Sequence, residues 1–270
     1  MVGNYRYPGI LMLINEPVLH RLVELYRQHE LAIFLGPDLP QSLTGVPSWS
    51  DLAQRLVERA GWSPMRGWPQ VAARYEQNFG RRNLIDWLDQ QVSVRQAGPI
   101  YSALAALSVE KYIVATYDEL LQIALRNAHR SPNVVVSDDD LSFVEPERST
   151  VIKLLGEASA GRRDTLLLTE DDLLRLPQNR SRLLAQEVQP VFASLSLLII
   201  GQNLRTDFFR DLYTQCSLQP LSARFRRPCF AIWSAMDDWE VQQWDARQMT
   251  ILDTEPLTLV RQILEICQPG

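Results

Sequence analysis

The sequence has few cysteines and no long apolar run. Its three cysteines in 270 residues, Cys216, Cys229 and Cys267, are scattered and odd in number. This excludes a disulfide framework and a four-cysteine zinc module. No apolar run approaches the roughly 20 residues of a membrane span, and the N-terminal segment lacks a small-residue cleavage site of the kind that ends a signal peptide. We therefore expect a protein of the reducing cytoplasm without a membrane partner.

Positive charge is also scarce. Lysine and arginine number 27 against 32 aspartates and glutamates, which gives a net charge of −5. The chain as a whole has no general attraction for nucleic acid, and we expect no direct contact with it. There are two local clusters of arginine: Arg224 with Arg226 and Arg227, and Arg162 with Arg163. We interpret both as ordinary surface residues in preference to a phosphate or nucleic-acid site.

Histidine is rare, and no histidine stands in an obvious catalytic pattern. His20 and His29 fall on the first expected helix, and His129 follows a later one. We interpret all three as surface residues. The acidic run from Asp138 to Asp140 lacks a spaced partner, so it favours a solvated turn over a metal site.

Short apolar segments alternate with segments of helical periodicity, which predicts an α/β fold. We expect a Rossmann-like, mostly parallel sheet with helices on both faces. The expected strands are 31–35, 112–115, 134–136, 150–154, 164–168, 195–200, 229–233 and 250–252. The expected helices are 17–30, 48–60, 69–79, 82–91, 99–107, 119–127, 180–193, 207–215 and 255–266. Residues 195–200 are the most hydrophobic strand and should be central.

The chain should form a single domain over residues 1–270, with a small helical lobe at roughly 60–108 and a loosely held arm at 1–16. Five aromatic residues fall in this lobe: Trp62, Trp68, Tyr75, Phe79 and Trp87. We interpret them as its core; the alternative is that an exposed subset docks a partner.

The stretch from Leu31 to Leu56 reads as strand, glycine turn, loop and helix, which is how nucleotide-binding α/β domains begin. Its turn is nevertheless Gly36, Pro37 and Asp38. Proline has no N–H to donate and aspartate adds a negative charge, so both oppose phosphate binding.

Ligands of parallel sheets bind at the carboxyl ends of the strands. Four polar segments follow expected strands and should gather around one cleft: 36–38, 116–118, 155–157 and 201–203. In this order they resemble the sirtuin-like family, in particular its bacterial branch with NAD-hydrolysing members in anti-phage defence. The segments that carry the resemblance are FLG with GVPSW at 34–49, IVATYDELL at 113–121, VIKLLG at 151–156, TED at 169–171 and LIIGQNLRTDFF at 198–209.

The resemblance implies that NAD or an ADP-ribose-like nucleotide is the ligand. The residues that it places at the nucleotide are Gly36, Asp38, Ser48, Thr116, Tyr117, Asp118, Gly201 and Asn203. It also implies a protein partner, or further fused domains beyond Gly270.

The departures from the family pattern concern its chemistry. The family's catalytic asparagine corresponds to Thr116, and its histidine base to Leu155. A leucine transfers no proton, and a threonine presents no amide to a ribose. The glycine-alanine-glycine loop is Gly36-Pro37-Asp38, and Asn203 and Thr206 stand where a serine and an aspartate are usual. The zinc-ribbon cysteines of the deacylase branch are absent.

Three functions follow as hypotheses. The first is a catalytically impaired sirtuin-like domain that acts as a scaffold or regulatory module in a bacterial defence or signalling system. The second is a nucleotide sensor without turnover. The third is an NAD hydrolase in which Tyr117, Asp118 or Glu157 stabilises an oxocarbenium-like charge.

The sequence leaves two alternative roles open for each of two residues. Asp118 is either a residual site residue or a cap of the helix that follows. Asn203 either touches a ribose or satisfies the turn at a strand end.

Overall fold

The computed structural model describes residues 16–65, 67–94, 96–233 and 236–267. The expected N-terminal arm therefore lies outside the described residues, apart from Glu16. Within the described part, every helix is too short or too polar to span a bilayer.

Seven parallel strands form one sheet in the order β3-β4-β2-β1-β5-β6-β7. This confirms the α/β, Rossmann-like fold. The strands are β1 (Leu31–Leu35), β2 (Lys111–Val114), β3 (Asn133–Val135), β4 (Thr150–Lys153), β5 (Ser196–Ile200), β6 (Cys229–Ile232) and β7 (Met249–Leu252).

The strand expected at 164–168 does not form. A single 3₁₀ turn, η2 (Arg163–Thr165), stands there instead. Leu166, Leu167 and Leu168 are buried as expected. They reach the core as an irregular segment whose Leu167 N–H donates to the Leu155 carbonyl at 2.9 Å. An apolar run of this length marks burial and does not by itself identify a strand.

The middle of the sheet is β1, paired with β2 on one side and β5 on the other. All five residues of both β1 and β5 are buried. Helices cover both faces of a parallel sheet, which explains why these strands are continuously apolar. From β1 the chain forms β2, then the edge strand β3, and returns to insert β4 between β2 and β3. It then crosses to the other side of β1 and forms β5, β6 and β7 in order. The strand order therefore reverses between β1 and β5.

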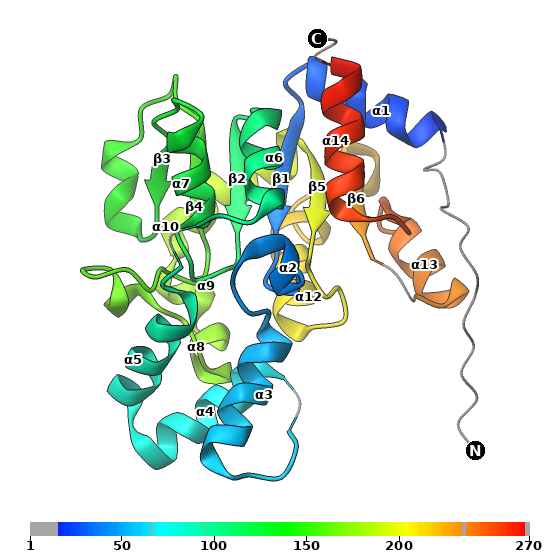
Figure 1. The fold of residues 1–270 in the computed structure, drawn as a ribbon. Helices are drawn as coiled ribbons and strands as arrows, with labels where there is room; N and C mark the ends of the chain where they lie inside the picture. The colour runs from blue at the N-terminus through cyan, green and yellow to red at the C-terminus, as the bar shows by residue number, and fades with distance from the viewer. Residues whose placement is uncertain (1–15, 66, 95, 234–235, 268–270) are drawn as a thin grey trace.

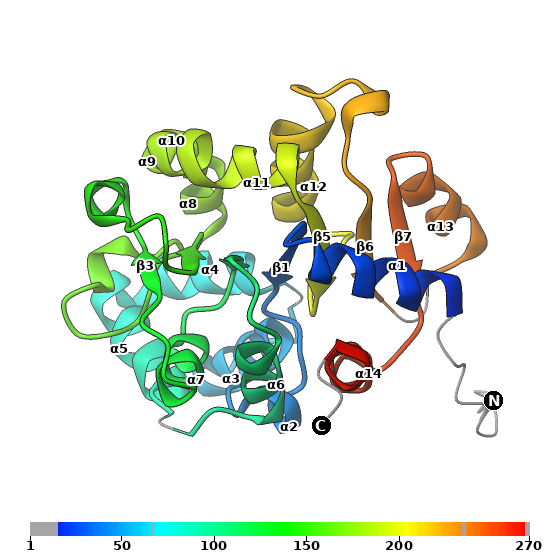
Figure 2. The ribbon, with the colours of Figure 1, turned by 90° about the horizontal axis from the view of Figure 1, so that it is seen from above.

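Two helical layers enclose the sheet, as Figure 2 shows. One layer contains α6 (Pro99–Leu107), α7 (Leu120–Asn127) and α14 (Pro256–Cys267), and α6 packs beside both of the others. On the other face lie α10 (Ser181–Leu183), η3 (Leu184–Val188), α11 (Gln189–Ser194), α12 (Asp207–Tyr213) and η4 (Thr214–Leu218). Apart from the helical lobe, the remaining elements are α1 (Glu16–Arg27), α2 (Gln41–Thr44), η1 (Asp138–Phe143), α8 (Glu170–Leu174), α9 (Leu176–Asn179), η5 (Ala223–Phe225) and α13 (Asp238–Asp245).

A helical lobe projects from the carboxyl-terminal edge of the sheet (Figure 1). It consists of α3 (Trp49–Ala60), α4 (Trp68–Phe79) and α5 (Arg81–Val92). Arg81 attaches it to the main body, because its guanidinium pairs with Asp172 at 2.9 Å and donates to the Leu166 carbonyl at 2.7 Å. Arg163 contributes a second attachment by pairing with Asp86 and Asp89 on α5.

Four of the five aromatic residues of the lobe belong to its core or pack against it, as expected. Trp68, Tyr75 and Trp87 are buried, and the Trp68 and Trp87 rings stack with centroids 6.1 Å apart. Trp62 packs against this group, whereas Phe79 is 46% exposed.

Candidate functional site

The turn after β1 packs directly on the turn after β5. A Cβ atom on Gly36 would lie 2.4 Å from the Gly201 carbonyl oxygen, and one on Gly201 would lie 2.3 Å from Leu39 Cγ. Gly201 also has a φ of +66°, which favours glycine. These two glycines are thus required by the close approach of one loop to the other.

The backbone donors of the first turn are already in use. Gly36 N–H donates to the Ile200 carbonyl and Asp38 N–H to the Gly201 carbonyl, both at 2.8 Å. Pro37 has no N–H at all. A phosphate cradle needs several free N–H groups pointing at one anion, so residues 36–38 do not provide one.

Asp38 bridges the two turns with its side chain. Its Oδ2 accepts a hydrogen bond from Asn203 N–H at 3.0 Å. Burial raises the pKa of this carboxyl to about 6, against the lowering effect of that hydrogen bond. Asp38 is therefore a half-buried carboxyl with a pKa of about 6.

Ser48 is the N-cap of α3. Its Oγ accepts from Asp51 N–H at 3.2 Å, and Ser48 N–H donates to the Asp51 carboxylate at 2.9 Å. This is a capping box, which stabilises the helix start. The hydroxyl that the resemblance assigns to a nucleotide is engaged with Asp51.

Thr116 and Asp118 border a small cavity. Its volume of about 20 Å³ is room for one water molecule, and its walls include Gly36, Pro37 and Trp49. The Asp118 carboxylate accepts from Tyr101 Oη at 3.2 Å and from Leu120 N–H at 2.9 Å. The second contact spans the turn just before α7, whose N-cap position is Glu119, so Asp118 stabilises that turn and also borders the cavity.

Tyr117 is fixed among aromatic side chains. Its hydroxyl accepts from Trp68 Nε1 at 3.0 Å and donates to the Leu167 carbonyl at 3.0 Å. Its ring stacks on Trp49, with centroids 6.4 Å apart. Burial raises the pKa of Tyr117, so the phenol stays neutral and links the lobe to the sheet.

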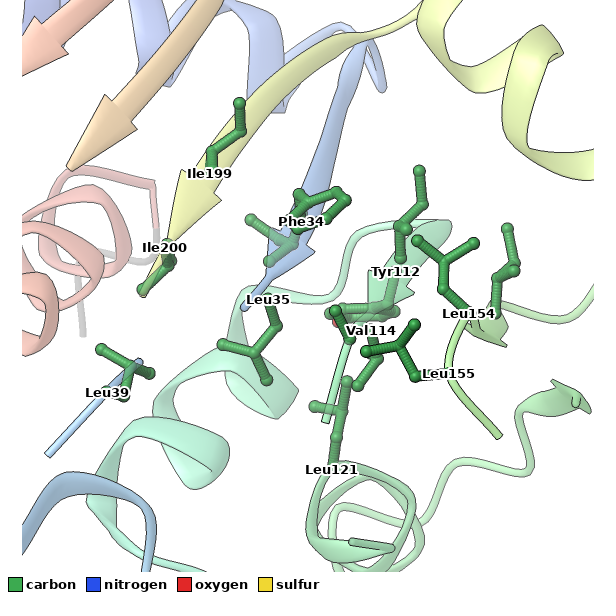
Figure 3. Close-up of a cluster of buried hydrophobic side chains, with 14 of the residues drawn as sticks. Phe34, Leu35, Leu39, Tyr112, Val114, Leu121, Leu154, Leu155, Ile199 and Ile200 are labelled. Atoms are coloured by element: carbon green, nitrogen blue, oxygen red, sulfur yellow. The ribbon is translucent and has the colours of Figure 1, made fainter. Parts of the chain in front are cut away.

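Leu155 belongs to the hydrophobic core. It is fully buried and lies in the cluster drawn in Figure 3, together with Val114 and Leu121. It lines neither the small cavity nor the wide cleft described below. Its side chain therefore packs in the core and faces neither opening.

Lys153, a fully buried lysine at the end of β4, was not identified from the sequence as a candidate site residue. Lys153 donates through Nζ to the Asp118 carbonyl. Burial lowers its pKa, while Asp118 and Glu157 oppose that shift. A lysine inside the apolar run TVIKLL was the available signal. Glu157 accepts from Gln122 at 2.6 Å and from Ser159 at 2.7 Å, and it lines neither cavity.

A wide cleft of about 1320 Å³ opens between the helical lobe and the α8 and α12 side of the main body. Asp38, Trp49 and Asn203 line it, and Trp49 also borders the small cavity. Asn203 Oδ1 accepts from Arg205 N–H at 2.9 Å, so its side chain stabilises the turn after β5 while it faces the cleft.

The remaining charged candidates have structural partners. Arg162 pairs with Asp140 at 2.7 Å, and Arg227 pairs with Glu30 at 3.0 Å. Arg226 donates to two backbone carbonyls. Asp138 accepts from two N–H groups at the start of α10. Within the described ranges, no group of three or more His, Cys, Asp or Glu is placed to hold a metal ion.

The histidines also serve local structure. His20 Nδ1 is 2.9 Å from the Glu16 carbonyl oxygen on the same helix. His29 and His129 both have a φ of +58° just after a helix, where the left-handed conformation ends it.

Comparison with known families assigns the chain to a family. The SIR2-like domain family matches residues 110–252, which is more than half of the chain. This chain belongs to the SIR2-like family. The match spans β2 through β7 and thus contains Thr116, Leu155 and Gly201.

Curated relatives of this SIR2-like chain include two proteins named NAD(+) hydrolase ThsA. The one from Acinetobacter baumannii is 28% identical over 59% of this chain and 34% of its own length. The one from Enterococcus faecium is 23% identical over 68% and 39%. The chain thus spans little more than a third of the length of these relatives.

A solved structure shows the same fold. A Sir2 homolog, crystallised as a complex with NAD, superposes with a TM-score of 0.51 at 11% identity, covering 93% of this chain and 94% of that one. At this identity the likeness concerns the fold alone.

Proposed function

We propose that this SIR2-like chain is a catalytically impaired domain that acts as a scaffold or regulatory module in a bacterial defence or signalling system. The observation that carries the proposal is the burial of Leu155 in the hydrophobic core, at the position of the family's histidine. No proton can be taken up there, and the surrounding apolar side chains leave no room for a substrate.

The neighbouring position supports the same proposal. Thr116 stands at the family's asparagine and borders a cavity of about 20 Å³, which is far smaller than a nucleotide. Loss of one catalytic group commonly costs on the order of 10² to 10⁴ in rate, and residues that act together fail together.

The test is nicotinamide release from NAD by the purified chain at high protein concentration, followed by chromatography. We expect no release above a protein-free control. Release that disappears in a Thr116→Ala or Asp118→Asn variant contradicts the proposal. Calorimetry with NAD and ADP-ribose then separates a scaffold, which gives no binding heat, from a nucleotide sensor, which does.

A second candidate is NAD hydrolysis by other residues. Two observations favour it: Asp38 lines the wide cleft with a pKa of about 6, and the curated relatives are named NAD(+) hydrolases. A carboxyl that titrates near neutral pH is suited to acid–base chemistry. This candidate predicts nicotinamide release that falls on the order of 100-fold or more in Asp38→Asn. Tyr117 and Glu157 fit the role less well, because neither lines the wide cleft.

A further inference from the structure

The crevice between β1 and β5 is where a ligand of this fold would place its anion. The strand order reverses at this point, and ligands of doubly wound sheets bind outside the carboxyl ends of the strands there. Backbone N–H groups in the adjacent turns are the usual partners of a phosphate.

A side chain of the protein itself occupies one of them. Asp38 Oδ2 lies 3.0 Å from Asn203 N, so a carboxylate from the β1 turn accepts the N–H of the β5 turn, 165 residues away in sequence. We propose that Asp38 is a built-in anion that fills the phosphate position of the β1–β5 crevice and closes the adjacent cleft to phosphate-bearing ligands. The inference deepens the proposed function and rests on it, because a chain that hydrolyses NAD must admit the pyrophosphate group of NAD.

The two turns hold Asp38 in this position. Its own N–H donates to the Gly201 carbonyl at 2.8 Å, and its carboxylate returns to Asn203 two residues later. The contact between Gly36 and Gly201 leaves no space for the turns to shift closer together. An external phosphate would therefore have to displace the carboxylate from a bond that the backbone has already aligned.

The charge of the cleft also disfavours the binding of a phosphate. Six carboxylate side chains line it: Asp38, Glu58, Glu170, Asp171, Asp207 and Asp211. Arg205 is the one basic residue among the lining residues that the structure describes, and it pairs with Glu240. Several like charges around one opening repel an incoming anion, although salt screens the exposed ones.

Two variants of Asp38 separate its charge from its hydrogen bond. Asp38→Asn keeps an oxygen acceptor for Asn203 N–H and removes the charge. Asp38→Ala removes both and frees the N–H. Glu58→Gln is the matched control, because Glu58 is an exposed carboxylate of the same cleft that makes no contact with the β1 or β5 turn in the hydrogen bonds observed.

The experiment titrates each variant with inorganic pyrophosphate and with ADP-ribose by calorimetry at pH 7.5. We expect weak or no binding to the wild type, at least a tenfold gain in association for Asp38→Ala, a smaller gain for Asp38→Asn, and less than a twofold change for Glu58→Gln. Thermal unfolding of each variant confirms that it is folded.

Two results overturn the inference. One is a folded Asp38→Ala protein that gains no affinity for either ligand, and the other is wild-type protein that binds pyrophosphate as tightly as the variant. Neither result depends on turnover. Nicotinamide release by the wild type would instead contradict the proposed function, so the two failures are distinguishable.

Discussion

The carboxyl ends of β2 and β4 differ sharply from those of β1 and β5. Above β2 and β4, Leu155 lies in the core and Thr116 borders a space for a single water molecule. Above β1 and β5, Asp38 and Asn203 face an open cleft of about 1320 Å³. One half of the strand-end region is packed as core, while the other half remains open and negatively charged. Under the proposed function, the packed half is the one that has lost its chemistry and the open half is the one available to a partner.

The largest effect should come from the glycine contact that joins the β1 and β5 turns. Gly36→Ala places a Cβ 2.4 Å from the Gly201 oxygen, so the two loops must separate. We expect a loss of about 3 kcal/mol in the free energy of unfolding, measured by urea denaturation. Gly61→Ala is the control: its φ of +66° strains a side chain, but no atom lies within 4 Å, so only about 1–2 kcal/mol should be lost. Equal losses in the two variants would refute the close-contact argument.

Leu155→Ala should lower the free energy of unfolding nearly as much as Gly36→Ala, because it leaves a cavity in the core. We expect about 3 kcal/mol by chemical denaturation. The comparison is with Asn203→Ala in the open half, which removes one hydrogen bond from the β5 turn and should cost about 1 kcal/mol. A Leu155 variant as stable as the wild type would mean that this position is not core.

Tyr117→Phe tests whether this residue is a structural link or part of a site. Removing the hydroxyl leaves Trp68 Nε1 and the Leu167 carbonyl without this partner. Unsatisfied buried groups cost about 1–3 kcal/mol, so we expect a thermal midpoint several degrees lower. An unchanged midpoint would indicate that the observed hydrogen bonds contribute nothing.

Asp38→Asn should produce the smallest change in the free energy of unfolding, and this variant should be more stable than the wild type. The pKa of Asp38 is about 6 in the folded protein, against an ordinary value of 3.8, so the folded protein favours the protonated carboxyl. The stabilisation from this group is fully present below pH 3.8 and is lost as pH rises through 6. We therefore expect the variant to gain about 1–2 kcal/mol over the wild type at pH 8 and nearly nothing at pH 4. A difference that does not vary with pH would show that Asp38 has no raised pKa.

The sequence predicted the sheet well because buried parallel strands are short continuous apolar runs, as in β1 and β5. It predicted the wrong state for 164–168, since an apolar run also marks an irregular buried segment. The candidate positions Thr116 and Leu155 were singled out through family resemblance. The Asp38–Asn203 bond and the Arg81 attachment of the lobe join residues far apart in sequence, so no local pattern contains them.

The central claim is tested most directly by incubating NAD with the wild-type chain at high concentration and measuring nicotinamide by chromatography. An NAD(+) hydrolase of the same family, assayed in parallel, shows that the assay detects turnover. We predict no nicotinamide above the protein-free background. Sustained release from the wild type, abolished by Asp38→Asn, would contradict the account and identify a working active site in the open half of the crevice.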